Sequence, residues 1–143
     1  MELQNGQFGY LGNVNVKKDG ISQQWTLDEV EEYSKCVEDA AYFARNYIKI
    51  VHLDKGLTPF DLYPYQEEMF QHFEDNRFSI VLACRQSGKS ISSVVYLLWY
   101  ALFHPDKTIA ILANKGATAR EMLARVTLAL ENLPFFLQAG CKV

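Results

Sequence analysis

The sequence lacks the features that mark several large classes of protein. Its three cysteines, Cys36, Cys84 and Cys141, are widely spaced and form no CxxC pair, so neither a disulfide framework nor a zinc site is indicated. The longest apolar run, Val94 to Phe103, is too short to span a bilayer, and the polar N-terminal residues contain no signal-peptide core. We therefore expect a protein of a reducing compartment with no membrane segment.

Runs of Lys and Arg that would bind nucleic acid by themselves are also missing. The charge that is present is distributed unevenly: residues 1–76 hold 6 Lys/Arg against 14 Asp/Glu, a net −8, whereas residues 77–143 hold 8 against 3, a net +5. The basic half contains a Gly-Lys-Ser triplet. Its positive charge suits an anion-binding site, although a solvated surface would explain the same excess.

With 143 residues, of which 49% are hydrophobic, the chain is long enough to form one packed domain. Residues 1–24, rich in Gly, Asn and Gln, are predicted to form an irregular arm. Residues 25–76 are predicted to be a helical lead-in. Thr26 and Glu29 make a capping box, and apolar residues then recur at three, four and seven positions up to Val51, which predicts one amphipathic helix. A shorter helix is expected after the break at "DKGLTPFDLYP".

In residues 77–143 the pattern changes to alternating strands and helices. The apolar runs at 78–83 and 108–114 are predicted to be buried strands, and the segments after them are predicted to be helices that end at Pro105 and Pro134. This order makes a right-handed βαβ unit with parallel strands. The predicted fold class is α/β, a partial P-loop NTPase domain with a parallel sheet and flanking helices, preceded by an N-terminal helical segment.

The window from Ala83 to Ser90 resembles a phosphate-binding loop, G-x-x-x-x-G-K-[ST], except that alanine replaces the first glycine. Gly88 lets the backbone approach phosphate closely, Lys89 supplies a cation, and the Ser90 hydroxyl can ligate Mg²⁺. Ala83 requires the loop to turn with different dihedral angles. The simpler alternative is an ordinary helix start capped by Ser87.

We therefore predict an ATP and Mg²⁺ site formed by Cys84, Arg85, Gln86, Ser87, Gly88, Lys89 and Ser90, with Ser90 as the metal ligand. Lys89 and Arg85 are the catalytic candidates, because the Arg85 guanidinium can stabilise charge on the γ-phosphate. A structural ion pair is the alternative role for Arg85. The acids after Ser90 do not end an apolar strand, so the carboxylates that hydrolysis requires are missing from the pattern.

Four segments in a fixed order, "YPYQEEM", "LACRQSGKS", "ILANKGATAREML" and "LPFFLQAG", resemble the large terminase subunit of tailed, T-even-like bacteriophages. The likeness runs from about Tyr33 to Val143. That family is an ATP-driven motor that packages double-stranded DNA, with an ATPase domain followed by a nuclease domain. The resemblance implies that residues 77–143 are the front of the ATPase domain, truncated before the Walker B strand and its Asp-Glu pair.

The resemblance also assigns roles and partners. It implies that Gln66 recognises adenine, that Arg85 is the arginine of the family's variant loop, and that the departure at Ala83 is normal. It implies a portal protein and a small terminase subunit as partners, an oligomeric ring, and a place in the host cytoplasm at the prohead portal. ATPase activity is expected in the full-length context rather than in this chain.

Two alternatives remain from the sequence. One is a fragment of a helicase-like, DNA-dependent ATPase with a similar core. The other is a nucleotide-binding or interaction module without catalysis. Both alternatives retain the phosphate-binding loop, and they differ in what would follow Val143.

Overall fold

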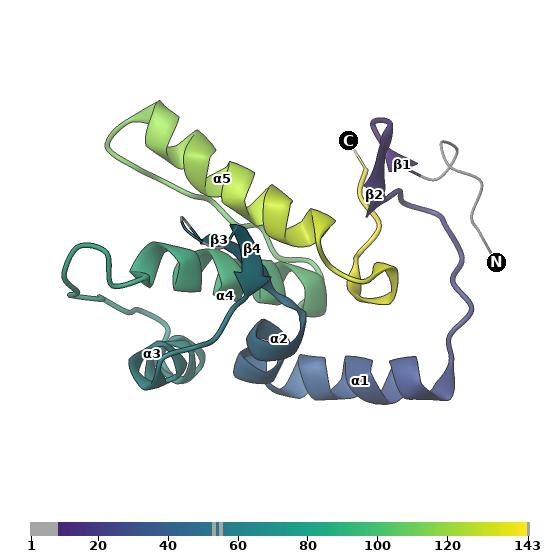
Figure 1. Ribbon diagram of the computed structural model, residues 1–143, viewed down its shortest axis with the longest axis horizontal. Helices are drawn as coiled ribbons and strands as arrows, with labels where there is room; N and C mark the ends of the chain where they lie inside the picture. The colour runs from purple at the N-terminus through teal and green to yellow at the C-terminus, as the bar shows by residue number, and fades with distance from the viewer. Residues whose placement is uncertain (1–8, 53, 55, 143) are drawn as a thin grey trace.

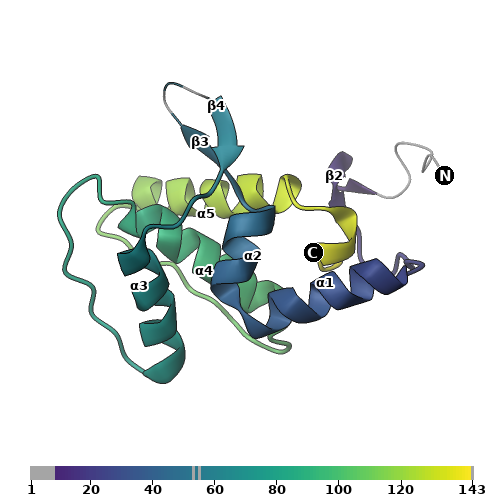
Figure 2. The same cartoon turned by 60° about the horizontal axis from the view of Figure 1, so that its bottom comes forward.

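The computed structural model describes residues 9–52, 54 and 56–142, and within these it contains five α-helices and two separate two-stranded antiparallel sheets. The helices form the body (Figure 1), and the β3–β4 hairpin stands out from it (Figure 2). In chain order the elements are β1 (Gly9–Tyr10), β2 (Asn13–Lys17), α1 (Leu27–Glu38), α2 (Ala40–Tyr47), β3 (Lys49–His52), β4 (Gly56–Pro59), α3 (Pro64–Asp75), α4 (Lys89–Phe103), α5 (Gly116–Glu131) and the 3₁₀ turn η1 (Phe135–Leu137).

Three of the predicted helices are confirmed with their ends close to the expected positions. α3 begins at Pro64, whose fixed φ and missing N–H suit the first helical position. α4 ends at Phe103 and α5 at Glu131, each shortly before a proline that cannot continue a helix. Proline therefore marks the start of α3 and the ends of α4 and α5.

The single helix predicted up to Val51 is wrong, because the chain breaks at Asp39. The Thr26–Glu29 capping box is present at the start of α1, but the Asp39 carboxylate accepts a hydrogen bond from the Ala41 N–H at 2.7 Å and begins α2. Beyond α2 the residues up to His52 pair with β4, with Ile50 opposite Thr58. Capping and strand pairing thus override the apolar periodicity.

The core lies where α1, α2, α3 and α4 meet the end of α5 and η1. Trp99 of α4 is buried, and its indole N–H donates to the Cys36 carbonyl of α1 at 2.7 Å. Phe43 packs edge-on against Phe103, with ring centroids 5.5 Å apart. Burial raises the pKa of the Cys36 thiol to about 12, so this cysteine is a protonated packing residue.

The predicted irregular arm contains the β1–β2 hairpin, and it is attached to the far end of the chain. Gln138 is buried and joins the two parts: its amide nitrogen donates to the carbonyls of Asn15, Leu130 and Leu133, and its oxygen accepts from the Lys17 N–H at 2.9 Å. These bonds satisfy one carbonyl of the last turn of α5, that of Leu130, and one just beyond it, that of Leu133, and they hold β2 beside this end of the helix.

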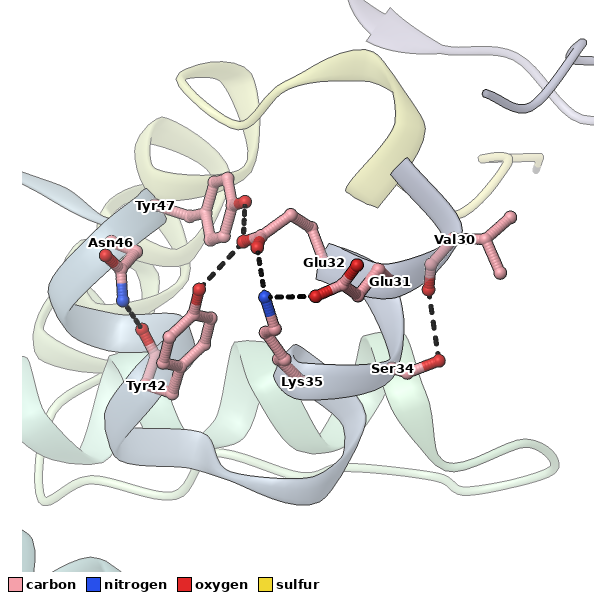
Figure 3. A network of polar contacts seen from close by, with 8 residues as sticks. All are labelled: Val30, Glu31, Glu32, Ser34, Lys35, Tyr42, Asn46 and Tyr47. Carbon is pink, nitrogen blue, oxygen red and sulfur yellow. Dashed lines mark hydrogen bonds and ion pairs between the residues drawn. The ribbon is translucent and has the colours of Figure 1, made fainter. Parts of the chain in front are cut away.

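A polar network fixes α1 against α2 (Figure 3). The Glu32 carboxylate accepts hydrogen bonds from the hydroxyls of Tyr42 at 2.8 Å and Tyr47 at 2.7 Å, and from the Lys35 ammonium at 2.9 Å. Lys35 also forms an ion pair with Glu31. Lys35, followed by the two tyrosine hydroxyls, lowers the pKa of Glu32 to about 2, because all three partners favour the ionised carboxylate.

The predicted parallel sheet is wrong, and the P-loop NTPase fold is therefore not indicated. Residues 78–83 and 108–114 contain no strand; in the described part of the chain the ladders are the two antiparallel hairpins, and the only parallel pairing is an isolated bridge between Lys18 and Cys141. Residues 76–88 instead form a long irregular connection between α3 and α4, which lies at the outside of these two helices (Figure 2). Apolar sequence alone cannot make a strand, because its backbone needs a neighbouring strand to bond.

Among the helices of residues 9–52, 54 and 56–142, none combines the length and the apolar character that crossing a membrane requires.

Candidate functional site

The Gly-Lys-Ser triplet lies at the start of α4, in a turn with unusual backbone angles. Gly88 is the N-cap residue, with φ 79° and ψ 5°, and Gln86 has φ 63°. Glycine adopts such angles without strain, whereas they are uncommon for glutamine. Gln86 and Gly88 are therefore the residues whose left-handed backbone conformation turns this loop. The motif begins at Ala83, where a phosphate-binding loop usually has glycine.

The loop closes on itself through the Cys84 carbonyl. The Lys89 ammonium and the Ser87 hydroxyl both donate hydrogen bonds to this oxygen, each at 3.0 Å. The first intrahelical bond of α4 runs from the Ser92 N–H to the Gly88 carbonyl. Gly88 has no side chain to cap the N–H groups of the first turn, so they can bind an anion.

This loop opens onto a cleft of about 1360 Å³, above the range of about 300–1,000 Å³ usual for small-ligand sites. Four parts of the chain line it: the loop from Gln86 to Ser90, the start of α3, the β3–β4 hairpin, and Arg125 of α5. The cleft therefore has room for a nucleotide that extends from the loop toward the hairpin.

Six of the predicted site residues line this cleft, namely Gln66, Gln86, Ser87, Gly88, Lys89 and Ser90. Cys84 and Arg85 are exposed, and the stretch of the loop that lines the cleft begins only after them, at Gln86. Cys84 takes part through its carbonyl, as described above. The structure thus brings Gln66 to the loop and places the Arg85 side chain outside the cleft.

Gln66 is the most constrained of these residues, because only 1% of it is exposed. Its side-chain oxygen accepts from the Tyr63 N–H at 2.9 Å, and its nitrogen lies so close to Gly88 that a Cβ added there would be 2.7 Å away. Beside it, the Tyr65 hydroxyl donates to the Ser87 carbonyl. Tyr65 is not among the residues predicted from the sequence, although it directly precedes Gln66 in "YPYQ".

Acidic residues at the cleft come from before the loop rather than after it. Asp54 and Asp61 both line the cleft. Within the described ranges no group of three or more His, Cys, Asp or Glu side chains is placed to hold a metal ion. Ser90 lines the cleft, and a serine hydroxyl is the kind of oxygen that could serve as one ligand of a Mg²⁺ ion carried by phosphate oxygens.

A scan of the chain against models of known protein families finds no match. The resemblance to terminases therefore rests on the four segments named above. The geometry of the cleft is an independent reason to consider a phosphate ligand.

Proposed function

We propose that this chain is the ATP-binding segment of a viral DNA-packaging terminase motor, which in its complete form couples ATP hydrolysis to the movement of double-stranded DNA. One observation carries the proposal: Gln66 and the loop from Gln86 to Ser90, which are separated in the sequence, meet in a single cleft. These are the two segments that the resemblance assigns to ATP.

The chemistry of the loop supports a phosphate ligand. The Lys89 ammonium is held by a neutral carbonyl, that of Cys84, and charge-assisted bonds to phosphate oxygens are stronger than bonds of this kind. A triphosphate therefore replaces Cys84 as the partner of Lys89. The N–H groups of the first turn of α4 complete the cradle, and Ser90 ligates Mg²⁺ bound to the same phosphates.

Arg85 is assigned the role of stabilising charge on the γ-phosphate. Its side chain is exposed at the edge of the loop, so this role requires it to turn toward the phosphates once ATP is bound. Partners of the motor are proposed on the resemblance alone: a portal protein, a small terminase subunit and other copies in a ring, at the prohead in the host cytoplasm.

The test is calorimetric titration of the chain with Mg-ATP. Lys89→Ala removes the cation of the loop, and we expect it to weaken binding by more than about tenfold. Lys107→Ala, in the exposed segment before α5, is the matched control and should bind as the wild type does. Equal affinities of the Lys89 variant and the wild type would reject the phosphate site, as would a wild type that does not bind Mg-ATP.

A further inference from the structure

Asp61 places a carboxylate in the cleft, a short way along the chain from Gln66. The residues on either side of it, Phe60 and Leu62, are only 3% and 5% exposed, whereas Asp61 itself is exposed. Tyr63 is exposed in turn. This alternation is that of extended backbone, in which neighbouring side chains point to opposite sides. The two buried side chains therefore anchor the stretch and present Asp61 and Tyr63 to the cleft.

The carboxylate of Asp61 is available to a ligand. Across residues 9–52, 54 and 56–142, no ion pair and no side-chain hydrogen bond engages it. Its place in the chain is nevertheless fixed, because the N–H of the preceding residue, Phe60, donates to the Ile48 carbonyl at 2.9 Å. Asp61 is thus an acceptor held in position by its neighbours without a bond of its own.

Gln66 turns back toward the same stretch. Its side-chain oxygen accepts a hydrogen bond from the Tyr63 N–H at 2.9 Å, and Tyr63 lies two residues after Asp61, on the same side of the stretch. Alternate residues of extended backbone are about 6–7 Å apart. The Gln66 amide and the Asp61 carboxylate are therefore near enough to contact one flat ligand.

The chemistry of the two groups matches one edge of adenine. That edge has an acceptor, N7, beside a donor, the 6-amino group. The oxygen of Gln66 is already bonded to the Tyr63 N–H, so its nitrogen, which can only donate, suits N7. The 6-amino group still requires an acceptor, and the carboxylate of Asp61 is one.

We propose that Asp61 accepts a hydrogen bond from the 6-amino group of adenine and thereby makes the cleft select ATP over the triphosphates of 6-oxo purines. This inference rests on the proposed ATP site, and it adds a second residue to the recognition of the base that the resemblance gives to Gln66. A 6-oxo purine has a carbonyl oxygen in place of the amino group, and this oxygen is an acceptor that a carboxylate repels.

The experiment measures by calorimetry the affinities for Mg-ATP, Mg-ITP and inorganic tripolyphosphate with Mg²⁺. The wild type should bind Mg-ATP at least about tenfold more tightly than Mg-ITP. Asp61→Asn keeps the shape, and its amide can accept from an amino group or donate to an oxo group. The preference should then fall below about threefold. The ratio of the two nucleotide affinities is the readout, because loss of the charge alone would change all three ligands alike.

Asp75→Asn is the matched control. It makes the same substitution at the end of α3, where the carboxylate accepts from the Gln71 amide at 3.1 Å and does not line the cleft. This variant should keep the preference of the wild type. Asp61 and Asp75 are both exposed, so both variants should fold as the wild type does.

Two results would overturn the inference: a wild type that binds Mg-ATP and Mg-ITP equally, and an Asp61→Asn variant that keeps the wild-type preference. Lys89→Ala separates these outcomes from a failure of the site. If it still weakens Mg-ATP and tripolyphosphate, the proposed ATP site survives and only the role of Asp61 is lost. If Lys89→Ala changes neither affinity, or the wild type binds none of the three ligands, the site fails and the inference fails with it.

Discussion

Helix α4 and the extended segment just before it, residues 78–83, have similar apolar composition and opposite environments. Val94 and Val95 of α4 are fully buried, whereas Ile80 and Leu82, shortly before the helix, are 95% and 99% exposed. A helix bonds its own backbone and needs only a surface to pack against. An extended segment needs another strand, and none pairs with residues 78–83. Hydrophobic residues therefore indicate that a segment favours burial, but they do not provide the neighbouring strand that an extended segment needs for its backbone hydrogen bonds.

A second extended segment, residues 108–114, follows α4 and differs from residues 78–83 in its environment. In the first, the large side chains of Phe78, Ile80 and Leu82 point outward. In the second, Ile109 and Ile111 lie with residues of α4 and α5 around an apolar cavity of about 360 Å³. Both keep the two-residue alternation of extended backbone, but only the second buries part of its larger side chains.

The sharpest way to test this comparison is amide hydrogen exchange, where we expect the largest effect. Amides in the buried turns of α4 should exchange at least about a thousandfold more slowly than those of residues 80–82, because the helix must open to exchange while the segment has no ladder bonds to break. Mass spectrometry of peptides covering 78–83 and 92–99 measures the difference. Slow exchange in the first peptide would show that this segment is paired, against the present structure.

A pair of substitutions to alanine tests the same contrast through side chains. Phe43 is fully buried, and Phe43→Ala should lower the free energy of unfolding by about 3–5 kcal/mol. Phe78 is 82% exposed, so Phe78→Ala should change it by less than about 0.5 kcal/mol. Denaturant titration followed by circular dichroism gives both values.

The milder variant Phe43→Leu keeps most of the buried volume and should cost less than about 1.5 kcal/mol. It preserves the test if the alanine variant is unfolded. Equal losses at Phe43 and Phe78 would mean that the outward-facing phenylalanine is buried in solution, and the comparison between helix and segment would no longer hold.

The sequence predicted the helices well because their boundaries have local causes. Pro64 starts α3, and prolines follow α4 and α5 closely. The parallel sheet was wrong because strand pairing is a long-range property that no local pattern contains. The break at Asp39 was missed for a smaller reason: a side-chain cap competes with helix continuation, and apolar periodicity does not register it.

For the candidate site, too, the sequence indicated the residues of a local motif but not the contacts between distant segments. The loop from Gln86 to Ser90 was predicted as a site because glycine, lysine and serine have distinct chemical roles at fixed spacing, and the structure places these residues in a cleft with Gln66. The Tyr65 hydroxyl bond was not foreseen, because contacts between α3 and the loop depend on how the chain folds back. The exposed position of the Arg85 side chain was not foreseen either. The motif specifies residue types and their spacing but not the direction in which each side chain points.

The smallest expected effect concerns the polar network of α1 and α2, which joins surface helices by charge rather than burial. Glu32→Gln keeps the shape but removes the charge that Lys35 and Tyr47 stabilise, so the melting temperature at neutral pH should fall less than for Phe43→Ala. The folded-state pKa of Glu32, about 2, lies below its ordinary value of 4.5. Its contribution is therefore complete above the ordinary value and is lost as the pH falls through about 2.

The measurement is the difference in melting temperature between wild type and Glu32→Gln across this acid range. The difference should be constant above about pH 5 and should shrink toward pH 2, because the protonated wild-type carboxyl then resembles the amide. Parallel curves down to pH 2 would show that the network adds no stability through its charge. The junction of α1 and α2 would then depend on packing and on hydrogen bonds that need no charge on Glu32.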